Sequence, residues 1–532
     1  MISRAATVFI LALFAATAQA QYNPARVTHE APAVAQRFPD PDILYDTPGF
    51  RPGRDDFTSH AEMLAFLARL TTESPHARLD ILGTSQRGLN LPLMLLTAGD
   101  RVDPQLPTVL VIGQQHGDEP AGGEAALVLA RQLAGPRQAI LTHVNVLIIP
   151  RGNPDGADQF RRATASGIDV NRDHLLLNTP EGRAIALAVD KYKPQVMLDL
   201  HEFTVAGRWV EKFGGVMKFD ALLQPATVGN LDPGIAASAA SDYIARIEAT
   251  LTANGLTSFK YHTTAAGSPR DKTVSMGGVQ ADTGRNVGGL RPAISLLIEV
   301  RGVGIGRAHF LRRVHTQVLA ATAAIELAAA QGPALIGLVE QAAMRTRRAA
   351  CQGDIVVEAQ LTETRERLTF LDAASGQDMP VEVDWRAASP LNVVRSRPRP
   401  CGYLFAGDQT VVIERLRQLG VEVHRVVREV SFEVERYVIT HEDDGKRQDA
   451  RGAIEDDAPI RKLEVRTERM SETIEAGTIY VPLDQPHAGL ITVAFEPDSQ
   501  NSFPANRLLD PERSQLRRVM QKPSGEAMER IR

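Results

Sequence analysis

The sequence has 532 residues, of which 43% are hydrophobic and 23% are charged, and its formal net charge is -5. This length and composition are typical of a globular protein with two or three domains. The weak negative charge and the aromatic content of only 5% argue against a nucleic-acid-binding surface.

The first twenty residues have the layout of a secretory signal peptide. Arg4 gives a positive start, residues 5–16 are apolar, and Ala18-Gln19-Ala20 fits the small-x-small cleavage pattern. We therefore expect cleavage after Ala20 and a periplasmic or secreted protein without a membrane segment. An uncleaved anchor is the alternative.

Residues 21–58 are rich in Pro, Asp and Arg and predict an extended arm. Between residues 59 and 335, apolar strands alternate with helices, which predicts an α/β domain whose sheet is largely covered. The strands are expected at 78–84, 89–97, 109–113, 144–150, 195–200 and 293–300. The helices are expected at 59–70, 122–133, 181–192, 236–253 and 307–330. Ligand sites in such sheets lie at the carboxyl ends of strands.

Residues 336–505 contain short, polar-alternating apolar runs and predict a smaller β-rich domain, followed by a charged tail over residues 506–532. Residues 413–419 could instead form a short helix. Cys351 and Cys401 are the two cysteines of the chain. Both a disulfide and two unpaired thiols fit the sequence.

His116 and Glu119 lie three residues apart, directly after the predicted strand 109–113. An imidazole and a carboxylate at this spacing can bind one metal ion, and a catalytic zinc site needs one further protein ligand. His201, at the end of another predicted strand, is the natural third ligand. A hydrogen-bonded core histidine is the alternative for His201.

Glu299 ends a strongly apolar predicted strand, where a carboxylate without a partner is costly to bury. A hydrolytic zinc site needs a base that takes a proton from water, and Glu299 can fill this role. A salt bridge to Arg301 is the alternative. Asp199 and Asp169 are equally good candidates for holding the ring of His201.

Two arginine-containing pairs, Arg161-Arg162 and Asn171-Arg172, flank a short segment in the Gly-rich connection that follows residue 150. Arginine binds carboxylates through two parallel hydrogen bonds and stabilises developing oxyanions. Surface charge is the usual role of such pairs, but this connection joins a strand to a helix, where binding sites are commonly built.

These motifs together resemble the zinc carboxypeptidases of the carboxypeptidase A type over roughly residues 59–331. The matching motifs are His116-Gly117-Asp118-Glu119, Asn153-Pro154-Asp155-Gly156, Gly167-Ile168-Asp169-Val170-Asn171-Arg172, His201 and Glu299. The segment from Leu82 to Gly88 also resembles the opening hairpin of that family. The resemblance implies a mixed β-sheet flanked by helices.

By this resemblance, one Zn²⁺ is held by His116, Glu119 and His201, and Asp169 orients His116. Arg162 is implied to polarise the scissile carbonyl, and Asn171 and Arg172 to bind the terminal carboxylate of the substrate. Glu299 is implied to be the general base that activates the zinc-bound water.

The sequence also departs from the family pattern. Asp173 and His174 follow the Asn-Arg pair, where the family has an aromatic residue or a second Asn. No Tyr lies between residues 272 and 293, where the family's lid tyrosine is expected, and Tyr261 is the nearest upstream candidate. Arg285 lies in the Gly-rich loop there and could contact substrate.

The resulting hypothesis is a zinc metallocarboxypeptidase that cleaves the C-terminal peptide bond of peptides. The first alternative is a zinc deacylase or amidase that acts on N-acyl amino acids or cell-wall peptides, since aspartoacylase-like relatives share the ligand layout. The second alternative is a non-catalytic binding protein on a metallopeptidase fold.

Overall fold

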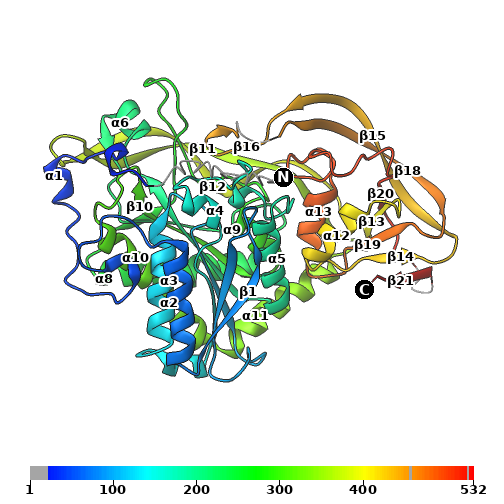
Figure 1. The fold of residues 1–532 in the computed structure, drawn as a ribbon. Helices are drawn as coiled ribbons and strands as arrows, with labels where there is room; N and C mark the ends of the chain where they lie inside the picture. Colours follow the sequence, from blue (N-terminus) through cyan, green and yellow to red (C-terminus); the bar gives the residue numbers. More distant parts are fainter. Residues whose placement is uncertain (1–21, 455–457, 524–526, 532) are drawn as a thin grey trace, which may run out of the picture.

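The computed structural model describes residues 22–454, 458–523 and 527–531 of the chain. The predicted signal peptide, with its cleavage point after Ala20, lies outside the described residues. Figure 1 shows a larger region of helices around a central sheet, and beside it a smaller β-rich region formed by the end of the chain. This architecture confirms the predicted fold class, a mixed sheet flanked by helices and followed by a β-rich region.

The larger region is built on an eight-stranded sheet in the order β1-β2-β4-β3-β5-β10-β7-β8. Its four central strands, β4, β3, β5 and β10, are parallel, whereas β1, β2 and β7 run antiparallel to a neighbour. The strands span Ala77–Thr84 (β1), Asn90–Leu96 (β2), Thr108–Gly113 (β3), Asn145–Ile149 (β4), Val196–Thr204 (β5), Ala221–Pro225 (β7), Ser258–Lys260 (β8) and Ile294–Val303 (β10).

Helices cover both faces of this sheet, which is why its central strands are continuous apolar runs. Along β3, Val109 and Val111 face the core under α2 (His60–Glu73), α3 (Pro120–Leu133), α8 (Ala245–Ala253) and α10 (Phe310–Gln331). Leu110 and Ile112 face the other core, under α5 (Pro180–Tyr192). The helix α2 begins at a capping box formed by Ser59 and Glu62.

The other helices of the larger region are shorter. They are α1 (Pro32–Ala35), α4 (Pro154–Asp158), α6 (Arg208–Phe213), α7 (Pro233–Ser238) and α9 (Gly284–Leu290). Three more helices follow α10 in the chain, namely α11 (Pro333–Arg348), α12 (Thr410–Gln418) and α13 (Ala488–Phe495). No single helix in the described ranges is long and apolar enough to span a membrane, although α10 and α11, which meet at 88°, pass that test of length and composition as a bent pair.

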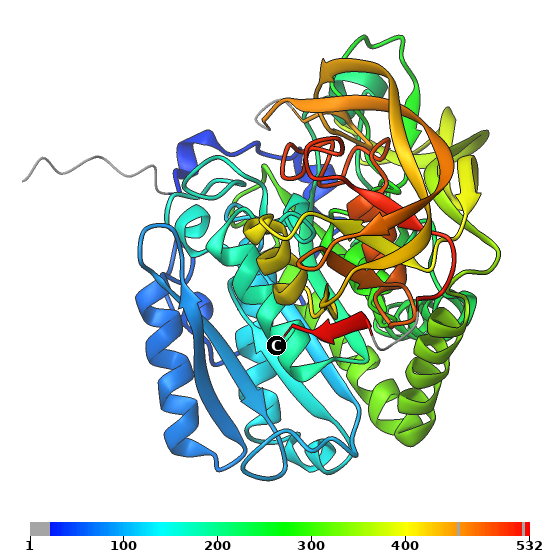
Figure 2. The same cartoon turned by 90° about the vertical axis from the view of Figure 1, so that its right-hand side faces the viewer.

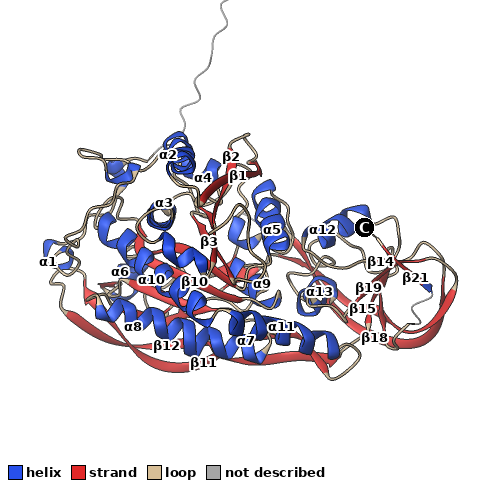
Figure 3. Ribbon diagram, turned by 90° about the horizontal axis from the view of Figure 1, so that it is seen from below, coloured by secondary structure: helices blue, strands red, loops and turns tan. Residues whose placement is uncertain are grey.

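A long hairpin joins the two regions. β11 (Asp354–Asp372) and β12 (Asp378–Pro398) form a sheet with β6 (Gly215–Val216) and β9 (Thr273–Ser275), two short strands that come from the larger region. Figure 3 shows this hairpin running along one side of the molecule toward the second sheet. A disulfide between Cys351 and Cys401 closes its base, so the two cysteines do pair.

The smaller region contains a seven-stranded antiparallel sheet in the order β18-β15-β20-β13-β19-β14-β21. These strands span Gly402–Phe405 (β13), His424–Val426 (β14), Val430–Gly445 (β15), Ile460–Ile474 (β18), Ile479–Pro482 (β19), Arg517–Val519 (β20) and Met528–Arg530 (β21). Figure 2 views the molecule from the side of this sheet and shows the long, curved ribbons of β15 and β18. The connection between these two long strands carries a small hairpin of β16 (Gln448–Asp449) and β17 (Gly452–Ala453).

The end of the chain differs from the tail expected over residues 506–532, because two of its segments are strands of this sheet. Arg518 explains the difference: it is fully buried and pairs with Glu496 at 3.1 Å and with Glu435. A charged side chain can be buried in this way when carboxylates surround it. The segment is charged, but the charge of Arg518 is neutralised inside the domain.

Candidate functional site

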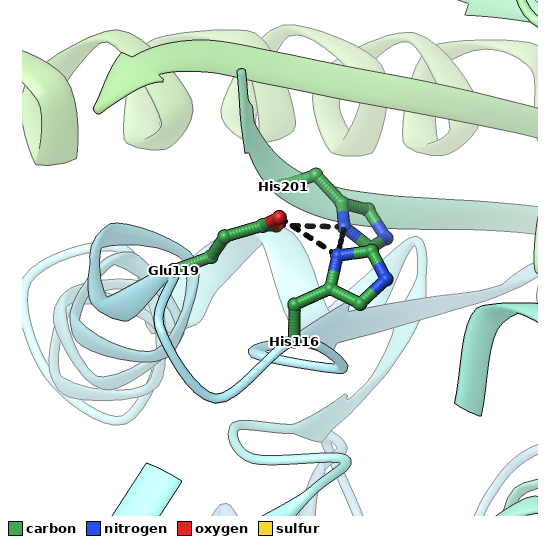
Figure 4. A group of neighbouring side chains, drawn as sticks. All are labelled: His116, Glu119 and His201. Atoms are coloured by element: carbon green, nitrogen blue, oxygen red, sulfur yellow. Dashed lines mark hydrogen bonds and ion pairs between the residues drawn. The ribbon is translucent and has the colours of Figure 1, made fainter. Parts of the chain in front are cut away.

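Three predicted ligands converge at the carboxyl end of the central parallel strands (Figure 4). His116 follows β3, Glu119 is the residue before α3, and His201 lies within β5, which continues to Thr204. All three side chains are buried. Two elements adjacent in the sheet, β3 and β5, therefore bring together residues that are 85 positions apart along the chain.

Two further carboxylates fix the direction of both imidazoles. Asp169 lies 3.0 Å from Nε2 of His116, and Asp199 lies 2.8 Å from Nε2 of His201. Each ring therefore turns its Nδ1 atom toward Glu119, at 2.8 Å for His116 and 2.9 Å for His201. Of the two candidates for the partner of His201, the geometry selects Asp199, and Asp169 holds His116.

This arrangement fits a zinc ion. The two Nδ1 atoms are 3.0 Å apart, and one donor atom from each of the three residues lies within 4.8 Å of the others. Two neutral imidazoles and one carboxylate are a known donor set of catalytic zinc, and carboxylates behind the imidazoles are its usual support. His116, Glu119 and His201 could therefore hold the metal.

Arg162 lies beside the ligands and shares Asp169 with His116. Its Nε and Nη2 atoms donate to one oxygen of Asp169 at 3.0 and 2.8 Å, while its Nη1 atom points to Glu119 at 3.4 Å. Burial alone would raise the pKa of Asp169, but the charge of Arg162 and the hydrogen bond with His116 hold it well below its usual range. Asp169 therefore stays ionised and fixes both neighbours.

Glu299 lies directly across from His201, because the parallel register of β10 and β5 pairs these two residues. Its side chain is buried and accepts no hydrogen bond from the described residues. Burial, reinforced by the nearby negative charge of Glu119, raises the pKa of Glu299 to about 7. A carboxylate poised near neutrality is suited to accept and return a proton.

The alternative of a Glu299–Arg301 salt bridge does not form, because the N-terminal arm supplies another partner. Arg301 pairs with Glu30 at 2.8 Å, and its guanidinium lies 3.4 Å from the ring centre of Phe38. Burial would raise the pKa of Glu30, but hydrogen bonds from His309 and Arg301 lower it to about 2. The arm thus binds Arg301, so that Arg301 does not pair with Glu299.

The residues expected to bind the terminal carboxylate line the same pocket. The side-chain nitrogen of Asn171 lies 3.0 Å from Nε2 of His201, and its oxygen accepts from the Gly284 amide at 2.7 Å. Arg172 pairs with Asp449 at 2.8 Å. Asn171 is thus bonded within the protein, and Arg172 is held by an acid of the smaller region.

The pocket at this site has a volume of about 210 Å³ and is lined by both regions of the chain. Tyr261 and Arg285 lie on its wall, as does the hairpin stretch Asp449-Ala450-Arg451. The hairpin was not identified as part of a site from the sequence, which shows only a charged segment there. Its one signal was an acidic residue between arginines, and this pattern is too common to be specific.

Comparisons with known proteins agree with this site. Residues 63–211 match a family model described as zinc carboxypeptidase. Carboxypeptidase 2 of Trichophyton rubrum is 27% identical over 463 residues, which cover 86% of this chain and 85% of the relative. Carboxypeptidase SOL1 of Arabidopsis thaliana is 34% identical over 128 residues, 20% of this chain and 26% of the relative. A solved structure of carboxypeptidase A from Helicoverpa armigera is also similar. The match covers 54% of this chain and 77% of that structure's chain, with 15% sequence identity and a TM-score of 0.41.

The site and these matches define the class of the protein as a metallopeptidase, a hydrolase that acts on peptides. Residues 63–211 match the zinc carboxypeptidase family model, so this part of the chain is a zinc carboxypeptidase domain.

Replacing a ligand should remove the metal. We expect His116→Ala to lower zinc from about one ion per chain to a small fraction of that after dialysis, because two protein ligands rarely retain zinc. Elemental analysis of the purified protein measures this directly. His143→Ala, which changes an exposed histidine, is the control. Equal zinc in both variants would contradict the assignment.

Proposed function

We propose that this enzyme hydrolyses the C-terminal peptide bond of peptides at a single zinc site formed by His116, Glu119 and His201. The observation that carries the proposal is Glu299, a buried carboxylate without a hydrogen-bond partner among the described residues, which lies across from His201. When bound, zinc supplies Lewis-acid polarisation of water and of the scissile carbonyl.

The side chains of the site divide the remaining work. Glu299 takes a proton from the attacking water and returns it to the nitrogen of the leaving amine. Arg162 donates hydrogen bonds to the carbonyl oxygen as negative charge develops on it. Arg172 attracts the terminal carboxylate of the substrate, and Asn171 keeps the adjoining wall in place through its bonds to His201 and Gly284.

The same proposal places the protein outside the cytoplasm. The predicted signal peptide supports export, and the Cys351–Cys401 disulfide is typical of proteins in oxidising compartments. Mass spectrometry of the exported protein should find a mature chain that begins at Gln21. A mature chain that still carries residues 1–20 would refute the cleavage.

A substrate panel tests the proposed reaction. We expect the purified enzyme to release the last residue of N-blocked dipeptides, and to leave the same peptides intact when their C-terminus is amidated, because Arg172 then has no carboxylate to attract. Amino acid release measured by chromatography is the readout. Turnover of N-acyl amino acids alone would favour the deacylase alternative instead.

The role of Glu299 has its own test. We expect Glu299→Gln to keep zinc but to lower kcat by about 10²–10⁴-fold, since the amide cannot accept the proton. In the wild type, kcat/KM should fall as the pH drops below about 7, because protonation of Glu299 removes the base. Wild-type turnover by Glu299→Gln with normal zinc content would exclude this role.

A further inference from the structure

Arg285 is a buried cation on the wall of the active-site pocket, and nothing in the proposed mechanism uses it. Its side chain is only 4% exposed. Nη2 donates to the carbonyl oxygen of Gly278 at 2.6 Å, whereas Nε is buried without a hydrogen-bond partner. Arg285 forms no ion pair with any described residue. A buried guanidinium without a direct salt bridge is costly, so it points to an anion that arrives from outside.

The other arginines that line the pocket either form a salt bridge or are partly exposed to water. Arg162 pairs with Asp169, and Arg172 and Arg451 both pair with Asp449. Arg208 has no acid partner either, but it is partly exposed to water, and its Nη1 atom donates to a backbone carbonyl. Arg285 is therefore the one buried arginine among the described residues lining this pocket that forms no salt bridge, and the acids that act on its charge, Asp282 and Asp199, do so without direct contact.

The surroundings hold the guanidinium in place. A Cβ atom on Gly277 would lie 2.8 Å from Nη2 of Arg285, so the glycine leaves the space that the guanidinium occupies. The amide of Asn286 donates to the carbonyls of Gly278 and Gln280, which fastens the same loop to α9. Burial lowers the pKa of Arg285 to about 10, so it still carries its charge at neutral pH.

Arg285 also lies close to the place of the substrate carboxylate. The residue before it, Gly284, donates its amide to Asn171, the neighbour of Arg172. Arg172 and Arg285 thus both line a pocket of about 210 Å³. A terminal residue with one carboxylate can pair with only one of them. A dicarboxylic residue can pair with both.

We infer that Arg285 binds the side-chain carboxylate of the residue being released, so that the enzyme prefers peptides ending in Glu or Asp. This inference rests on the proposed function, because it takes Arg172 as the site of the terminal carboxylate. Arg285 is then the residue that determines specificity.

Matched peptides test the preference on the full-length zinc enzyme. N-blocked dipeptides that end in Glu or in Gln have the same shape and differ in charge, and Asp and Asn form a second pair. We expect kcat/KM to be on the order of 10–100-fold higher for the acidic member, because a neutral amide leaves the buried guanidinium without a counter-charge. Equal or faster cleavage of the amide member would overturn the inference.

Variants of Arg285 assign the preference to this residue. Arg285→Gln should lower kcat/KM for the Glu peptide until it matches that for the Gln peptide, and should change the Gln value by less than about threefold. Arg285→Lys, which keeps the charge, should retain part of the preference, and Arg365→Gln, a change at an 85% exposed side chain, should retain all of it. An equal loss for both peptides would mean that Arg285 holds the terminal carboxylate or supports the fold, and would refute the inference.

A binding measurement separates this inference from the proposed reaction. Free glutamate should raise the Tm of the wild type more than glutamine does, and this difference should vanish in Arg285→Gln. If glutamate binds through Arg285 but no peptide is cleaved, the proposed function fails and the binding site stands. If peptides are cleaved without an acidic preference, only the inference on Arg285 fails.

Discussion

The site depends on two hydrogen bonds, one from each imidazole to a carboxylate behind it. Asp169 and Asp199 hold the Nε2 atoms of His116 and His201, and this alone leaves both Nδ1 atoms facing Glu119. An imidazole without such a partner could rotate about its bond to Cβ and present either nitrogen. The backbone brings the residues together, but these carboxylates decide which atoms meet.

The same physical constraint, that a buried charge needs a partner, organises the rest of the pocket. Glu30 on the N-terminal arm pairs with Arg301, and Asp449 on the smaller region pairs with Arg172. Both acids lie far in sequence from the arginines they neutralise. Glu299 and Arg285, which are buried in the pocket wall, form no salt bridge with a described residue, and these are the groups to which we assign proton transfer and recognition of the substrate.

Much of the site could be predicted from the sequence because its signals are local. His116 and Glu119 share one motif, and His201 and Glu299 each interrupt an apolar run that must be a buried strand. The contribution of Asp449 could not be predicted, because it depends on a contact between segments 277 residues apart. The strand at Arg518 was missed for a related reason. The charges of this segment predict that it is exposed to water. The sequence does not show that the distant Glu496 pairs with Arg518 and makes its burial possible.

The helices and strands likewise divide into those with a local sequence signal, which could be predicted, and those that depend on distant contacts, which could not. The six strands and five helices predicted up to α10 have boundaries close to those observed, since both faces of the sheet demand continuous apolar residues, whereas β7 and β8 of the same sheet were not predicted. Beyond that helix, the α11 helix and the strands of the tail were not anticipated. Their positions are set by packing against other parts of the chain rather than by their own pattern.

The hairpin of β11 and β12 makes the two regions dependent on each other. Phe370 and Trp385, one from each of these strands, share an apolar core with Trp209 and Phe213 of α6, while β6 and β9 complete the sheet around them. A gene fragment that ended after α10 would encode every zinc ligand and yet leave this core open to water. The larger region therefore needs the hairpin to close its own apolar core.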